Sequence, residues 1–232
     1  MRKAESKSNA NKPTARTKIL DAALSAIRNK GYCATTVDDL CADAEVTKGA
    51  FFHHFKSKEE LGVAAAEHWS SVTGGLFETA PYHAHRDPLD RVLGYLDFRE
   101  VILRGAVPEF TCLVGTMVQE VYDTSPAIRD ACDASISAHA ATVEADIAEA
   151  MRNYGIAADW TAESLALHTQ AVLQGAFILA KARGGPAVAA DSIAHLRRYI
   201  EMLFGRQLRK GDAIEVTPRE RKREKEREKR KE

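Results

Sequence analysis

The 232-residue sequence predicts an all-α fold organised as two helical domains. Apolar residues recur at spacings of three and four along almost the whole chain, as they do on the buried face of a helix. Several segments begin with Ser or Thr followed three residues later by Asp or Glu, which is the pairing that caps a helix N-terminus. No segment shows the strict alternation of apolar and polar residues that predicts a strand.

Four helices are expected in the first 77 residues. The first ends near the glycine cap Gly31. Two short helices follow, over about 36–44 and 47–54, and the earlier one begins with a capping box of Thr36 and Asp39. A third capping signal at Ser57 opens a longer helix. The apolar faces of the two longer helices are Ile19, Ala22, Ala23, Ala26 and Ile27, and then Leu61, Ala65, Trp69, Val72 and Leu76.

The middle of the chain predicts a loop and three more helices. Residues 78–88 lack helical periodicity and contain two prolines, so we expect a loop. A helix should follow over about 89–103, then a shorter one over 110–122. Ser125, with a proline after it, begins a long helix that reaches Gly155, about 40 Å away at 1.5 Å per residue.

The last two helices predict a homodimer. The segment 165–182 is apolar or small nearly all round, and a turn at 184–186 leads to a final helix with a broad apolar face. Two such faces exceed what the core of one subunit requires, so two copies are expected to pair through them. The interface residues expected are Gly175, Leu179, Leu196, Tyr199, Ile200 and Leu203.

The two short helices fit a helix-turn-helix unit, whose second helix enters the DNA major groove N-terminus first. Phe51 can anchor that helix, and Gly49 lets the backbone approach closely. The alternative is a helix pair that packs without any DNA role. Ala50, like Phe51, can lie close to the bases or anchor the helix. The residues expected to reach phosphates or base edges are Thr47, Lys48, His53, His54 and Lys58.

Residues 14–61 resemble the DNA-binding domain of tetracycline-repressor (TetR) family regulators, through "ILDAAL", "KGYCATTVDDL" and "TKGAFFHHFKSKEEL". The resemblance implies an all-helical homodimer that represses transcription and leaves a palindromic operator when a small molecule binds its C-terminal domain. It also adds Thr36 and Phe52 to the residues at or near the DNA. Residues 112–130, "CLVGTMVQEVYDTSPAIRD", look like a segment found in one large branch of the family.

Two residues depart from the family pattern. The family usually carries tyrosine where Phe52 stands, and its hydroxyl often touches a phosphate; Phe52 can pack but cannot make that hydrogen bond. The family usually carries glycine where Glu45 stands in the turn. If that position needs a positive φ, Glu45 is strained, and its charge lies poorly beside phosphate.

A mainly apolar cavity with a few polar groups is expected in the C-terminal domain. The alternative is that the aromatic residues of this domain pack in its core. His139 and His168 could either line the cavity or pack in the core. Cys112 is expected to begin a helix, with Lys181 near enough to favour a reactive, electrophile-sensing thiol; the alternative is a small buried residue. The expected cavity residues are Trp69, Tyr95, Phe98, Cys112, Met117, Gln119, Tyr122, His168, Gln174 and Phe177.

The charge distribution suggests how the chain is organised. Its 33 basic and 33 acidic residues cancel, yet basic segments flank an acidic body, and the last 14 residues are all charged. The tail is expected to be solvated, or else to help hold DNA. We expect a basic arm (1–13), a DNA-binding domain (14–61) with its motif at 36–55, a ligand-binding and dimerisation domain (62–207) and a charged tail (208–232).

Other classes of protein are disfavoured. No apolar run is long enough to span a membrane, no signal peptide begins the chain, and the four scattered cysteines suggest reduced thiols, so a cytoplasmic location is expected. No catalytic residues, cofactor or metal are expected, because zinc-protease, serine-hydrolase and phosphate-loop patterns are absent and the paired histidines lack further ligands. An architectural DNA-binding protein and an activator remain as alternatives.

Overall fold

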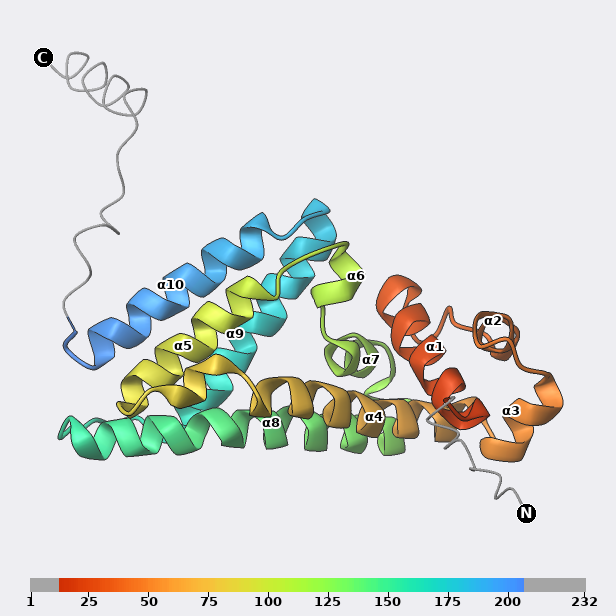
Figure 1. The fold of residues 1–232 in the computed structure, drawn as a ribbon, viewed down its shortest axis with the longest axis horizontal. Helices are drawn as coiled ribbons and strands as arrows, with labels where there is room; N and C mark the ends of the chain where they lie inside the picture. The colour runs from red at the N-terminus through yellow and green to blue at the C-terminus, as the bar shows by residue number, and fades with distance from the viewer. Residues whose placement is uncertain (1–12, 207–232) are drawn as a thin grey trace, which may run out of the picture.

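The computed structural model describes residues 13–206, and every regular element in that range is a helix. All of the basic arm (1–13) except Pro13, and the whole of the charged tail (208–232), lie outside the described residues. Figure 1 shows an elongated molecule in which α4 and α8 run side by side along its length. The first three helices occupy one end, and α5, α9 and α10 occupy the other.

The N-terminal helices follow the capping signals of the sequence. Gly31 caps the first helix, Thr36 and Asp39 form the predicted capping box, and the side chains of Thr47 and Ser57 accept the backbone N–H groups of Ala50 and Glu60. The expected helix starts are therefore confirmed. These helices are α1 (Ala15–Lys30), α2 (Val37–Asp43), α3 (Lys48–His54) and α4 (Lys58–Glu78).

The middle of the chain differs from expectation in two places. The expected loop contains a 3-10 helix, η1 (Pro81–Ala84), before α5 (Pro88–Val101). The helix expected over 110–122 begins only at Leu113, because Thr111 and Cys112 adopt extended backbone, and a separate short helix precedes them. The result is two helices, α6 (Val107–Phe110) and α7 (Leu113–Val121), with Cys112 as the cap of the second.

Three long helices complete the chain as far as residue 206. Ser125 caps α8 (Pro126–Asn153) with proline in the first turn, as expected. Then come α9 (Ala162–Arg183) and α10 (Ala187–Leu203), which are separated by the predicted turn, where Gly184 is left-handed with φ 73°. None of the described helices combines the length and apolar character needed to cross a membrane.

Two apolar clusters hold the helices together. One joins α4, η1, α5, α8, α9 and α10, and the other joins α1 to α3 with the start of α4, all of α7 and the start of α8. Leu113 and Met117 of α7 are completely buried in the second cluster. The expected domain boundary after residue 61 falls within α4, and the cores of the two ends share this helix and α8.

Candidate DNA-binding surface and ligand cavity

The turn between α2 and α3 closes with a Schellman motif. The Val46 amide donates to the Cys41 carbonyl at 2.9 Å, and the Glu45 amide donates to the Ala42 carbonyl at 3.2 Å. In this motif the residue just before the last donor, here Glu45, lies in the left-handed region. Glu45 has φ 54°, and it is the one non-glycine residue with positive φ among residues 13–206. The positive φ expected at Glu45 is therefore confirmed.

Helix α3, the second helix of the expected helix-turn-helix unit, packs through one face and exposes the other. The Phe51 ring is completely buried and lies 5.7 Å from the ring of Phe55. On the opposite face Phe52 is 54% exposed, and Lys48, Gly49 and His53 are exposed as well. The first turn of the helix, the part that reads base edges in a helix-turn-helix unit, is thus open to solvent.

The remaining expected contacts lie around this helix. Thr36 is exposed at the start of α2 and Thr47 at the start of α3, while Ala50 and His54 are half-buried. The Lys58 ammonium lies 4.4 Å from the centre of the Tyr32 ring and donates to the Cys33 carbonyl at 3.2 Å.

Lys48 is already engaged in an exposed ion pair. Its ammonium lies 2.7 Å from a carboxylate oxygen of Asp38 on α2, and hydrogen bonding to that carboxylate raises the pKa of Lys48. Sequence reasoning did not anticipate this pair. It places an acidic side chain on the same surface as the expected phosphate contacts.

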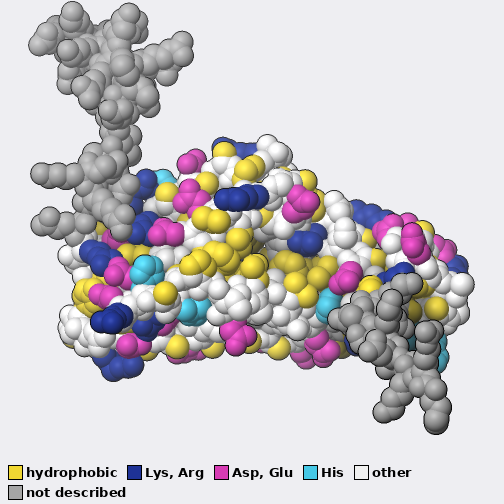
Figure 2. Space-filling view, in the orientation of Figure 1, with side chains coloured by type: hydrophobic (Ala, Val, Ile, Leu, Met, Phe, Trp, Pro, Cys, Tyr) yellow, Lys and Arg dark blue, Asp and Glu magenta, His cyan; other side chains and the backbone are white. Residues whose placement is uncertain are grey.

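A cavity of about 320 Å³ lies among α4, α5, α7, α8 and α9. Trp69 and Phe77 of α4 form one wall, and Phe110 and Phe177 contribute further aromatic surface. Leu76 lines the cavity and is 46% exposed, so the cavity opens to solvent beside α4. In Figure 2 apolar side chains form a band across the middle of this face.

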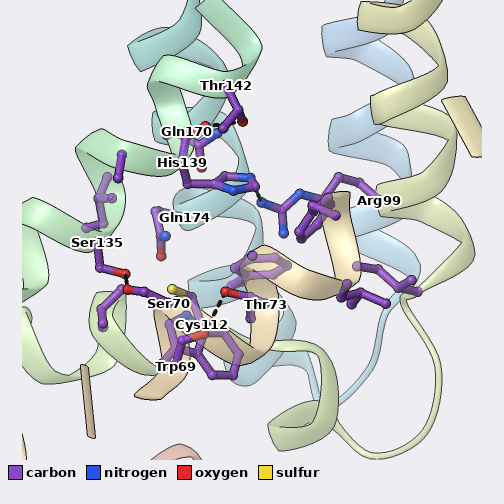
Figure 3. A pocket seen from close by; sticks show the side chains of 18 of the residues that line it. Trp69, Ser70, Thr73, Arg99, Cys112, Ser135, His139, Thr142, Gln170 and Gln174 are labelled. Atoms are coloured by element: carbon purple, nitrogen blue, oxygen red, sulfur yellow. Dashed lines mark hydrogen bonds between the residues drawn. The ribbon is translucent and has the colours of Figure 1, made fainter. Parts of the chain in front are cut away.

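A polar cluster forms one end of the cavity. Arg99 and His139 point toward each other from α5 and α8 (Figure 3), with an Arg99 Nη2 to His139 Nε2 distance of 2.7 Å. The Tyr95 hydroxyl accepts Arg99 Nε–H at 2.9 Å and Gln170 Nε2–H at 3.2 Å. Burial, with a smaller contribution from the charge of Arg99, lowers the pKa of His139 to about 3, so the ring is neutral at neutral pH.

Four of the residues expected in the cavity line it: Trp69, Cys112, Gln174 and Phe177. Tyr95 and Phe98 do not, because Tyr95 lies behind Arg99 and the ring of Phe98 packs edge-on against Phe77. Sequence reasoning missed further polar lining residues; those labelled in Figure 3 include Ser70, Thr73, Arg99, Ser135 and Gln170. Nothing in the sequence singled out Arg99, because α5 carries four other charged residues: Asp90, Arg91, Asp97 and Glu100.

The other expected cavity residues were also placed wrongly. Met117 is buried in the apolar cluster of the DNA-binding end, and Tyr122 is 61% exposed at the end of α7. His168 lies on the outer side of α9, where its ring centre is 5.5 Å from that of Tyr199. Gln119 lines a neighbouring, shallower pocket of about 230 Å³ instead. A single sequence does not show which side of each helix meets the cavity.

Cys112 lies between the two pockets and lines both. Its sulfur accepts the Gly115 amide at 3.4 Å at the start of α7. Lys181 lines the second pocket and donates to the Thr116 hydroxyl at 2.7 Å. Burial lowers the pKa of Lys181, which lies close enough to Cys112 for their charges to interact.

Two contacts connect the cavity to the DNA-binding end. The Arg28 guanidinium of α1 lies 5.2 Å from the centre of the Trp69 ring, and it donates to the Glu109 carbonyl at 3.1 Å. On α7, Glu120 accepts the Cys33 amide at 2.7 Å in the turn before α2. A side chain at Gly31 would collide with this carboxylate, so glycine permits the close approach.

The outer faces of α9 and α10 expose large apolar side chains. Of the residues expected at a dimer interface, Gly175, Leu179 and Tyr199 are exposed there. Leu196 and Ile200 were placed wrongly, because both are buried in the core of their own subunit, and Leu203 packs partly against it. Large exposed residues on these two helices that had not been anticipated are Leu167, Ile178 and Met202.

Among residues 13–206, no three His, Cys, Asp or Glu side chains gather in an arrangement that could hold a metal ion. His53 and His54 lie with ring centres 5.0 Å apart on the exposed part of α3. A role at the DNA surface therefore suits this pair better than a role in binding a metal.

Comparison with known proteins gives two family matches. Residues 19–65 match the family described as "Bacterial regulatory proteins, tetR family", and residues 88–196 match "Tetracyclin repressor-like, C-terminal domain". Together these matches cover more than half of the chain.

The chain is also similar to individual regulators. It is 29% identical over 103 residues to the transcriptional regulator AcuR of Cereibacter sphaeroides, covering 44% of this chain and 47% of AcuR. It is 32% identical over 107 residues to the repressor NemR of Escherichia coli K12, covering 45% of this chain and 52% of NemR. The chain thus matches about half the length of these relatives.

Solved structures share the fold. The regulator CifR, a cysteine mutant in complex with 26-base-pair operator DNA, superposes with a TM-score of 0.67 and 22% identity over 81% of this chain and 98% of CifR.

Proposed function

The chain belongs to the TetR family of bacterial regulatory proteins, which are DNA-binding transcriptional regulators and not enzymes, and we propose that it is a homodimeric repressor that a small molecule releases from a palindromic operator. The observation that carries the proposal is the course of α4. This helix begins beside the exposed recognition helix and continues into the wall of the cavity. One rigid element therefore contacts both sites.

The DNA-binding part of the proposal rests on α3 and its surroundings. Residues 47–54 enter the major groove, with Lys48, His53 and the helix N-terminus facing DNA, while Lys58 supports the backbone contact. Phe52 supplies apolar contact at the position where the family usually carries tyrosine. The operator complex of CifR supports this placement because the two chains share a fold.

The dimer part rests on the exposed apolar faces of α9 and α10. Leu179, Tyr199 and Met202 are each more than 40% exposed, which costs free energy in water. A two-fold contact buries the same patch on both subunits. It also fixes the distance between the two recognition helices, so each meets a half-site one or more helical turns from the other.

Release requires that ligand binds one arrangement of the helices better than the other. A ligand in the cavity presses on Trp69 and on the start of α7, and these contact α1 and the turn before α2 through Arg28 and Glu120. Movement of α4 and α7 then changes the spacing of the two recognition helices. The cavity itself favours this proposal over a ligand-independent architectural protein.

Fluorescence anisotropy with DNA from upstream of this protein's own gene tests the proposal. The titration is run at two salt concentrations with excess random DNA as competitor. Tight, competitor-resistant binding to one palindrome is expected. Binding that the competitor abolishes at both salt concentrations on every upstream fragment would contradict a specific repressor of this gene. A transcription assay on the same fragment separates a repressor from an activator.

A thiol-based signal is a second candidate function, favoured by the position of Cys112 at the helix N-terminus between the two pockets. The Cys112 sulfur would add to the carbon–carbon double bond of an electrophilic alkene: the S–C bond forms as the π bond breaks, and the adjacent carbon takes up a proton. The Lys181 ammonium lies close enough for its charge to interact with Cys112. Its test is mass spectrometry after brief treatment with N-ethylmaleimide.

Two other cysteines serve as controls in that experiment. Burial raises the pKa of Cys132 to about 12, and partial desolvation together with Glu120 raises the pKa of the exposed Cys33. Cys112 should be labelled faster than either. Labelling of Cys112 no faster than that of Cys132 would eliminate the thiol candidate.

A further inference from the structure

Arg99 brings a positive charge to the cavity without an acidic partner. Within residues 13–206 its guanidinium forms no ion pair with any carboxylate, whereas Arg91, on the same helix, binds Asp146 at 2.6 Å and also Glu149. Arg99 thus lacks the acidic partners that Arg91 has.

Glu109 is the one carboxylate among the residues that line the cavity. Its Oε2 accepts the Ala106 amide at 2.6 Å and caps α6. This carboxylate is therefore engaged at the start of α6 and forms no ion pair with Arg99.

The protein holds one edge of the Arg99 guanidinium and leaves the other edge available. Nε–H donates to the Tyr95 hydroxyl, and one Nη2–H donates to His139. A guanidinium carries five N–H donors, so the two on Nη1 and the second on Nη2 have no partner within residues 13–206. These lie at the end of the fork, where a carboxylate binds with two parallel hydrogen bonds.

The surroundings fix the position of this cation without neutralising it. The Arg99 guanidinium lies 4.3 Å from the centre of the Phe77 ring, which restricts its plane. The neutral His139 ring accepts a hydrogen bond but brings no negative charge. A partly buried cation in an apolar setting is costly without an opposite charge, and an anionic ligand would supply one.

We propose that the effector is an organic anion, with a carboxylate that pairs with the free end of Arg99 and an apolar body of one or two rings lying between Trp69, Phe110 and Phe177. This inference rests on the proposed function, because it names the class of molecule that fills the regulatory cavity. The cavity of about 320 Å³ suits a body of that size. A cationic ligand of the same shape would be repelled by Arg99.

Calorimetry of the full-length protein tests this class with matched probes. The carboxylates are 4-tert-butylbenzoate and biphenyl-4-carboxylate, and each is paired with its primary amide, which has nearly the same shape and no charge. The wild type should bind the carboxylates roughly 10- to 100-fold more tightly than the amides, as expected for charge-assisted hydrogen bonds to a partly buried cation.

Three variants assign the preference to one side chain. Arg99→Met should remove the preference for carboxylates, and Arg99→Lys, which keeps the charge but loses the fork, should keep only part of it. Arg104→Met, which changes an exposed arginine outside the cavity, should bind all four probes as the wild type does. Circular dichroism of each variant confirms that it is folded.

Several results would overturn the inference: equal affinity of the wild type for acids and amides, an undiminished preference in both Arg99 variants, or no binding of either carboxylate at millimolar concentration. Operator anisotropy with the same probes tests release separately. A carboxylate that binds through Arg99 but leaves the DNA complex intact would support the anion site and contradict release. Specific DNA binding without any binding of carboxylates would support the DNA-binding function and contradict the anion site.

Discussion

Replacing Glu45 by glycine should stabilise the protein. Glu45 occupies the left-handed position of the turn with φ 54°, and its side chain makes no hydrogen bond or ion pair within residues 13–206. Two other Schellman motifs, after α8 and α10, carry Gly155 and Gly205 at the same position, with φ 63° and 65°. The chain thus uses glycine twice where the recognition turn uses glutamate.

The magnitude follows from two opposing costs. A non-glycine residue in the left-handed region costs roughly 1–2 kcal/mol. Glycine loses about 0.5–1 kcal/mol more conformational entropy on folding. The net gain for Glu45→Gly is therefore about 0.5–1 kcal/mol, measured as the free energy of unfolding in urea at fixed protein concentration.

Two further variants separate backbone strain from charge. Glu45→Gln keeps the strain and loses the charge, so its stability should stay near that of the wild type. Gly155→Ala adds the strain at a site where no atom lies within 4 Å of the new methyl group, so it should lose about 1 kcal/mol. Both Glu45 variants should bind operator DNA more tightly, because each removes a negative charge near phosphate. Equal stabilisation by Gln and Gly, or destabilisation by Gly, would refute the reasoning.

Four other outcomes are expected. The pKa of His139 is lowered from 6.5 to about 3 in the folded protein, so as the pH falls the unfolded chain binds a proton at His139 before the folded protein does. The free energy of unfolding should therefore fall by about 2 kcal/mol between pH 8 and pH 5. His139→Gln should flatten this fall in urea titrations. Lys48→Ala should weaken DNA binding and reduce its salt slope by about one, and an unchanged slope would remove Lys48 from the interface. Glu120→Gln should leave ligand affinity intact while reducing ligand-induced DNA release in anisotropy assays, and full release would exclude this route. Leu179→Asp should give monomers by sedimentation whereas the exposed control Val101→Asp should not, and dimers in both would place the interface elsewhere.

Local signals in the sequence predicted most of the helices. The caps at Thr36, Thr47, Ser57 and Ser125 depend on neighbouring residues alone, and each begins a helix as expected. The short helix α6 was not predicted, because four residues show too little apolar periodicity to reveal a helix, and the extended backbone at Thr111 and Cys112 separates it from α7.

The cavity could be predicted only in part. Aromatic and other large apolar residues are common in both cores and cavities, so Met117 and Tyr122 could not be distinguished from Trp69 by residue type. Their positions depend on how α7 packs against α1, which is a contact distant in sequence. Arg99 was missed for a different reason: it is one of several charged residues on α5, such residues are usually solvated, and only the fold brings His139 to it.

The most direct test of the central claim is dimethyl sulfate protection of the operator by the wild-type protein. The reagent methylates guanine N7 in the major groove and adenine N3 in the minor groove. If residues 47–54 of two subunits enter successive major grooves, guanines should be protected in two half-sites that are one or more helical turns apart, while adenine N3 stays reactive between them. Protection of adenine N3 alone, or of one continuous segment without two-fold symmetry, would contradict the account.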